Sequence, residues 1–180
     1  MTTRNTPLKD LMVIEPEIFE DKRGYFFESY NKEKFKAAGI LPEFIQDNQS
    51  LSQKDVLRGL HLQNPPWEQG KLVRVIKGAV LDVALDVRKN SPTYGKHFSI
   101  ILSEHNKTQL WIPPGFAHGF KTLENETIFY YKCTQLYNRE SETGIKWNDP
   151  ELGIDWDIEN PSISDKDAIL PLWTDFTSLF

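Results

Sequence analysis

The chain has 180 residues, of which 39% are hydrophobic and 26% charged, and its formal net charge at pH 7 is −5. This composition predicts a single domain over residues 1–180, while scattered basic residues and the lack of a long apolar run argue against a nucleic-acid-binding or membrane protein. The only cysteine, Cys133, excludes an internal disulfide bond and, with a polar N-terminus that lacks a secretory signal, predicts a cytoplasmic protein.

The first third of the chain combines strand and helix signals. Asn31 is a candidate N-cap and Gly39 a stop signal, which together predict a short helix from Asn31 to Ala38. Strand-like segments lie on both sides of it, at residues 11–14, 24–30 and 43–50.

The central part of the chain predicts a series of short strands. Residues 79–87 alternate between two faces, one with Leu81, Val83, Leu85 and Val87, the other with Asp82, Ala84 and Asp86. Further strands are predicted at residues 71–77, 97–102, 108–112, 119–123 and 127–136, the last two paired with each other across residues 124–126.

Short strands at this even spacing predict an all-β fold, a closed barrel or jelly roll with a few short helices. Its 11 phenylalanines and 5 tryptophans are expected to fill the space between the sheets. The Asp- and Pro-rich tail from Trp147 is expected to wrap the barrel, with a helical turn that starts at Ser164. Because a jelly roll pairs or covers its edges, we hypothesise that an N-terminal strand is exchanged with a partner subunit.

Two of the four histidines lie in segments that otherwise have the composition of buried strands, Leu57–Gln63 and Trp111–Phe120. A histidine such as His61, flanked by two leucines, is either a core residue bonded to a backbone carbonyl or a general base. Nearby Arg58 favours the second interpretation. Strand alternation places Arg58 and His61 on opposite faces, unless a bulge at Gly59 brings both into one site.

Two further residues allow a structural and a functional interpretation. Lys71 follows Gly70 at the start of a strand, and on the sequence alone we favour a side chain exposed to solvent at the strand end. The alternative is a side chain that points inward and stabilises an oxyanion with its positive charge. Tyr131 lies in an aromatic strand. It is either a residue of the hydrophobic core with its hydroxyl at the rim of that core, or a phenol that delivers a proton from the face opposite the histidine.

A metal site is the main alternative for the histidine segments. The sequence from Pro114 to His118 matches a pattern of metal-binding barrels, but a second histidine next to His61 and a following glutamate are missing. Two imidazoles without a third strong ligand bind divalent metals poorly, so a metal-free site is expected. The chain also lacks nucleotide-binding glycine loops and a Gly-X-Ser-X-Gly elbow, and Cys133 is interpreted as a packing residue.

The ordered set of motifs resembles the dTDP-4-dehydrorhamnose 3,5-epimerase family, which has a cupin-like jelly-roll fold. The resemblance runs nearly end to end, and one departure is Leu62, where many members carry an aromatic residue. The segments are, in chain order, Phe19–Glu28, Gln46–Ser50, Leu57–Gln63, Gln69–Val75, Pro113–Phe120, Tyr130–Lys132, Gly144–Pro150 and Ser164–Asp167.

This resemblance implies a homodimer that epimerises a dTDP-linked 4-keto-6-deoxy sugar at C3 and C5 without a metal or redox cofactor. His61 then corresponds to the base, oriented by Asp167, and Tyr131 to the opposing acid. Lys71 would lie by the C4 oxygen, and His118 would line the same pocket.

The resemblance also assigns residues to the nucleotide. Arg23 and Arg58 match residues that contact the diphosphate, and Tyr137 matches an aromatic that stacks on thymine. Other matching binding positions are Glu28, Gln46, Asn48, Glu142 and Lys166. With an exchanged N-terminal strand, Arg23 and Glu28 would serve the neighbouring subunit's site.

Three alternatives stay open at this point. One is an epimerase that inverts only C3 or only C5, since the same base and acid serve both reactions. The others are a metal-dependent cupin enzyme and a sugar-nucleotide binding protein without catalytic activity.

Overall fold

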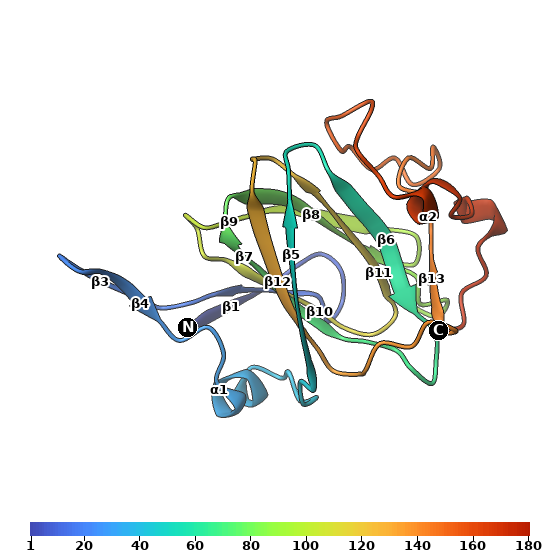
Figure 1. The fold of residues 1–180 in the computed structure, drawn as a ribbon. Helices are drawn as coiled ribbons and strands as arrows, with labels where there is room; N and C mark the ends of the chain where they lie inside the picture. The colour runs from blue at the N-terminus through green and yellow to red at the C-terminus, as the bar shows by residue number, and fades with distance from the viewer.

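The computed structural model describes residues 1–180 and consists mainly of two antiparallel sheets that face each other (Figure 1). The six-stranded sheet has the order β1 (Thr2–Asn5), β2 (Met12–Glu15), β10 (Gln109–Ile112), β7 (Lys71–Lys77), β12 (Thr127–Cys133), β5 (Gln46–Ser52). The five-stranded sheet has the order β13 (Glu142–Gly144), β6 (Leu57–Gln63), β11 (Phe116–Thr122), β8 (Ala79–Asp86), β9 (His97–Ser103). The all-β prediction is therefore confirmed.

The remaining elements are short. β3 (Ile18–Asp21) and β4 (Gly24–Phe27) form a separate hairpin, and the helices are α1 (Lys32–Ala37), α2 (Asp165–Ala168) and the 3₁₀ turn η1 (Trp173–Asp175). The N-cap prediction for α1 is confirmed, since the Asn31 side chain accepts hydrogen bonds from the backbone N–H of Glu33 and Lys34. None of the helices has the length and apolar composition of a membrane span.

The main core lies between the two sheets and contains aromatic residues from both. Phe120 on β11 and Phe129 on β12 stack there with ring centroids 4.1 Å apart. A second core forms on the outer face of the five-stranded sheet, where the tail covers Val83 and Leu85 with Trp156. The alternation predicted for residues 79–87 is thus confirmed, and both faces of β8 are buried.

One predicted strand pairing is wrong. Residues 119–123 and 127–136 do not form a hairpin, because both edges of β11 are occupied by β6 and β8 in the five-stranded sheet. β12 instead pairs with β5 and β7 in the other sheet. The segment between β11 and β12 therefore crosses from one sheet to the other.

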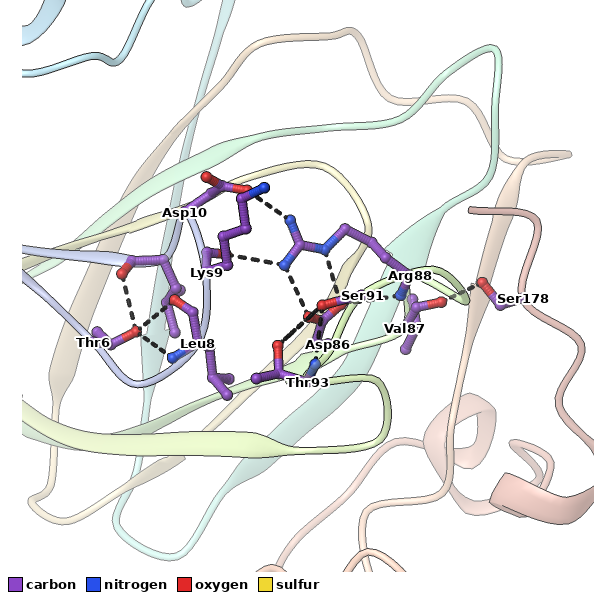
Figure 2. Close-up of polar contacts among 11 residues, drawn as sticks. Thr6, Leu8, Lys9, Asp10, Asp86, Val87, Arg88, Ser91, Thr93 and Ser178 are labelled. Atoms are coloured by element: carbon purple, nitrogen blue, oxygen red, sulfur yellow. Dashed lines mark hydrogen bonds and ion pairs between the residues drawn. The ribbon is translucent and has the colours of Figure 1, made fainter.

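A polar network beside β8 joins the N-terminal loop to the turn after β8 (Figure 2). Asp86 is fully buried and accepts hydrogen bonds from Arg88, Ser91 and Thr93. The Arg88 guanidinium also binds Asp10 at 3.0 Å. Burial pushes the pKa of Asp86 upward, but these hydrogen bonds outweigh burial and hold the pKa below its ordinary value.

We expect Asp86→Ala to lower the free energy of unfolding by about 3 kcal/mol, because the partly buried guanidinium and hydroxyls lose their acceptor. Since the folded pKa is depressed, the network stabilises the fold above the unfolded value of about 3.9 and loses this contribution as the pH falls through the folded value. Urea unfolding measures both effects. Asp10→Ala is the matched control, expected to cost under about 1 kcal/mol because Asp10 is exposed. An equal loss in both variants would contradict the assignment.

The β3–β4 hairpin projects away from the two sheets (Figure 1). Three of its aromatic side chains are exposed, Phe19 by 57%, Tyr25 by 55% and Phe26 by 69%. Such an exposed apolar surface is typical of a contact surface.

Candidate functional site

A bulge in β6 brings Arg58 and His61 into one cavity. Arg58 lies opposite Phe120 and His61 opposite His118, so that two residues of β6 face only Gly119. A Cβ atom on Gly59 would lie 2.5 Å from Cα of Gly119, which restricts this position to glycine. Of the alternatives that the sequence left open, the bulge is therefore confirmed.

The cavity, of about 550 Å³, lies between the sheets and is closed on one side by the C-terminal tail. Its polar lining includes Arg58, His61 and His118 from the five-stranded sheet, Gln49, Lys71 and Tyr131 from the six-stranded sheet, and Ser164, Lys166 and Asp167 from the tail. A second cavity, of about 340 Å³, shares His61, Lys71 and Tyr131 with the first.

His61 forms a close pair with Asp167. The distance from His61 Nε2 to Asp167 Oδ1 is 2.6 Å, and the other oxygen, Oδ2, accepts a hydrogen bond from the backbone N–H of Gly59 at 3.3 Å. Burial raises the pKa of Asp167, but the contacts with His61, Gly59 and Ser164 outweigh burial and lower it. An ionised carboxylate at this position orients the imidazole ring toward the cavity.

Lys71 and Tyr131 face the cavity from the opposite sheet. Lys71 shares its strand face with Val73 and Val75, which are buried in the core, and this alternation directs Lys71 inward. The predicted solvated strand end is therefore wrong. Burial lowers the pKa of Lys71 and raises that of Tyr131 to about 12, so the phenol is protonated at neutral pH.

His118, which lines the cavity, belongs to a second histidine–carboxylate pair, and its partner Asp82 was not identified as a site residue from the sequence. His118 Nε2 lies 2.9 Å from Oδ2 of Asp82, and both residues are buried. Oδ1 of Asp82 has no hydrogen-bond partner. The available signal was an aspartate in the middle of a strand with apolar neighbours on both sides, a burial that is costly unless the carboxylate is paired.

The predicted binding residues of the main body gather around the two cavities. Tyr137 donates a hydrogen bond to Glu142 at 2.7 Å, and Lys166 forms an ion pair with Glu142. Gln46 donates to Asn48 at 3.2 Å. The guanidinium of Arg58 is held by the hydroxyl of Ser52 at 3.1 Å and has no carboxylate within salt-bridge distance.

Arg23 and Glu28 are not part of this arrangement in the single chain. Arg23 lies on the turn of the projecting hairpin and pairs with Asp21, its side chain 84% exposed. Glu28 pairs with Lys34 at 2.9 Å. Neither residue lines the cavities that contain His61.

The donor set of the site does not include a metal-binding cluster. No group of three or more His, Cys, Asp or Glu side chains has a geometry that could hold a metal ion. Instead, the two cavity histidines are each paired with a carboxylate.

Comparisons with known proteins point to one family. Residues 5–175 match the family model described as dTDP-4-dehydrorhamnose 3,5-epimerase. The chain is 51% identical to a Shigella flexneri protein of that name over 168 residues, which covers 93% of each chain. A crystal structure of the Elizabethkingia anophelis protein of the same name has a TM-score of 0.93 and 49% identity and covers 97% of each chain. A Legionella pneumophila structure, RmlC in complex with dTDP-4-keto-L-rhamnose, has a TM-score of 0.94 and 48% identity and covers 98% of this chain and 94% of the other.

Proposed function

The chain belongs to the dTDP-4-dehydrorhamnose 3,5-epimerase family, and we propose that His61 removes a proton from one face of the bound sugar and that Tyr131 returns a proton to the opposite face. Its fold is the cupin-like jelly roll of that family. It is an isomerase that acts on a dTDP-linked sugar, converting dTDP-4-dehydro-6-deoxy-D-glucose to dTDP-4-dehydro-L-rhamnose in dTDP-rhamnose biosynthesis.

The carbonyl group of the substrate makes the chemistry possible. The ketone at C4 acidifies the hydrogens at C3 and C5, because the carbanion formed at either carbon is delocalised onto the C4 oxygen as an enolate. Inversion requires that the proton leaves from one face of the ring and a proton returns to the opposite face. The site must therefore supply a base, an acid and a positive charge.

The observation that carries the proposal is the placement of these three groups on two facing sheets. His61, paired with Asp167 at 2.6 Å, stands on the five-stranded sheet and takes the proton. Lys71 stands on the six-stranded sheet as the cation for the enolate oxygen. Tyr131 on the same sheet donates its phenolic proton to the other face of the ring. Solvent then reprotonates the phenolate and accepts the proton that His61 had taken, which restores both groups.

Proton NMR of the keto-sugar in heavy water tests this function. The wild-type protein is expected to exchange the hydrogens at C3 and C5 with solvent deuterium and to form the L-configured product. Exchange at only one carbon would identify a single-centre epimerase, and binding without any exchange would identify a non-catalytic binding protein.

Tyr131→Phe is expected to slow product formation by about 10²-fold and solvent exchange by less, because the base remains while the returning acid is lost. The partial burial of this phenol, which raises its pKa to about 12, keeps it protonated for this role. Tyr130→Phe, on the same strand with its hydroxyl bonded to Asp47, is the matched control. Parallel losses of exchange and product in Tyr131→Phe would assign another role to the phenol.

The residues around the two cavities also provide contacts for the nucleotide. In this proposal Arg58 binds the diphosphate, since guanidinium matches phosphate geometry and this one has no carboxylate partner. Tyr137 stacks on the thymine. Further contacts come from Gln46, Asn48, His118, Glu142 and Lys166. The reaction needs no metal or redox cofactor and takes place in the cytoplasm.

We further propose a homodimer in which the β3–β4 hairpin of one subunit completes the site of the other. The hairpin projects from its own chain and exposes three aromatic residues, while Arg23 and Glu28 lie outside the chain's own cavities. In the dimer Arg23 would reach the diphosphate and Glu28 the nucleotide of the neighbouring site.

Mixed dimers test the exchange of the hairpin. A heterodimer of one His61→Asn and one Arg23→Ala subunit, isolated with two affinity tags, is expected to recover roughly half of the wild-type activity, since one of its sites carries both lesions and the other neither. The two parent homodimers, each with one lesion in every site, provide the baseline. If the hairpin serves its own chain, no site is intact and the heterodimer is as inactive as its parents.

A further inference from the structure

The carboxylate of Asp167 is held in a fixed direction although it comes from a small element. Both of its oxygens are engaged, Oδ1 by His61 and Oδ2 by the backbone N–H of Gly59, and only 2% of the residue is exposed. Yet α2, which carries it, has four residues and lies in a tail that consists mainly of coil. A helix this short does not form stably without outside support.

Ser164 supplies that support at the first turn of α2. It is the N-cap residue, with extended backbone angles of φ −76° and ψ 155°, and its hydroxyl accepts a hydrogen bond from the backbone N–H of Asp167 at 3.1 Å. Its carbonyl oxygen accepts a hydrogen bond from the N–H of Ala168 at 3.0 Å. The Ser164 side chain therefore fixes the backbone from which the catalytic carboxylate extends.

The Ser164 hydroxyl also influences the carboxylate itself. Burial acts to raise the pKa of Asp167, whereas His61, the Gly59 N–H and the Ser164 side chain act to lower it, and their combined effect is the larger. The serine thus contacts the backbone of Asp167 and also contributes to the low pKa of its carboxyl group. It also lies at the edge of the cavity that contains His61.

We propose that Ser164 is a positioning residue of the epimerase: it holds the Asp167 carboxylate at the distance and direction from which it bonds His61. The inference rests on the proposed function of His61 as the base. In this inference the C-terminal tail contributes to catalysis by orienting the base. The short distance between Asp167 and His61 depends on the turn of α2 that Ser164 caps.

Two simpler roles of Ser164 predict different results. A serine that only contacts the ligand would change KM and the affinity for dTDP. A serine that only caps the helix would change the melting temperature. A positioning residue changes kcat and leaves the affinity unchanged, because the substrate still binds but the base is misdirected.

Four variants separate these roles in the heavy-water assay. Ser164→Ala is expected to lower kcat and deuterium exchange by about 10- to 100-fold, with KM and the Kd of dTDP within about twofold of wild type. Ser164→Thr restores a capping hydroxyl and is expected to return kcat to within about threefold. Ser164→Gly is expected to fold nearly as well as wild type, since glycine is an acceptable N-cap, and to lose as much kcat as the alanine variant.

Ser162→Ala is the matched control. Ser162 lines the same cavity two residues earlier, and its hydroxyl makes no hydrogen bond in the structure, so near wild-type activity is expected. Wild-type kcat in Ser164→Ala or Ser164→Gly, an equal loss in Ser162→Ala, or no recovery in Ser164→Thr would overturn the inference. If wild type itself shows no exchange, it is the proposed function that fails.

Discussion

Replacing His61 with asparagine is expected to lower epimerisation and solvent exchange by about 10³-fold or more, since positioned proton transfer by a side chain contributes about 10²- to 10⁴-fold. His61 is the cavity residue that combines an imidazole with a carboxylate at 2.6 Å and partial access to the cavity. Asparagine retains an amide that can bond Asp167, so the fold of the tail should be preserved. The change therefore removes the base and little else.

The measurement is loss of the C3 and C5 signals of the keto-sugar in heavy water. His97→Asn is a suitable control, because His97 is also partly buried but stands on β9, outside the cavity lining. Full retention of exchange in His61→Asn, or an equal loss in His97→Asn, would remove His61 from the role of base.

The second large effect is expected for Lys71→Met, with a loss of about 10²- to 10³-fold in both exchange and product formation. Methionine is similar in length but carries no charge, so the enolate oxygen loses its counterion. Because burial lowers the pKa of Lys71, the wild-type rate should also fall at an alkaline pH below the ordinary range for lysine, as the cation is lost.

Lys77→Met on the same strand is the matched control. Lys77 is exposed at the opposite end of β7, where it pairs with Glu126 at 2.8 Å. It is expected to retain wild-type activity. A loss below about tenfold in Lys71→Met would show that the enolate charge is stabilised elsewhere. The parallel loss of exchange and product also distinguishes this variant from Tyr131→Phe, in which exchange is better preserved.

The elements that the sequence predicted well are those defined by neighbouring residues. The cap of α1 at Asn31, the turn at Ser164 and the alternation along β8 each depend on side chains within a few positions of one another. Strand pairing is different, because it depends on partners far away in the chain. Residues 119–123 and 127–136 were joined across a short turn, although β11 already has a partner on each edge.

The candidate site shows the same division. Local patterns identified His61 and the glycine at which β6 bulges, but not the direction of Lys71, which follows from the packing of the whole sheet. The partnership of Asp167 with His61 spans 106 positions of the sequence and could be expected only through family resemblance. Asp82 was placed on the correct face of its strand, and its pairing with His118 required the register between β8 and β11.

The stacked rings of Phe120 and Phe129 belong both to the hydrophobic core and to the wall of the proposed sugar site. The two rings line the cavity from opposite sheets, so the contact that supports the core also sets the width of the proposed sugar site. Smaller side chains there would admit a bulkier sugar but forfeit about 3–5 kcal/mol for each phenylalanine truncated to alanine. A variant that accepts a bulkier sugar therefore requires stabilising substitutions elsewhere in the barrel that offset this loss in the free energy of unfolding.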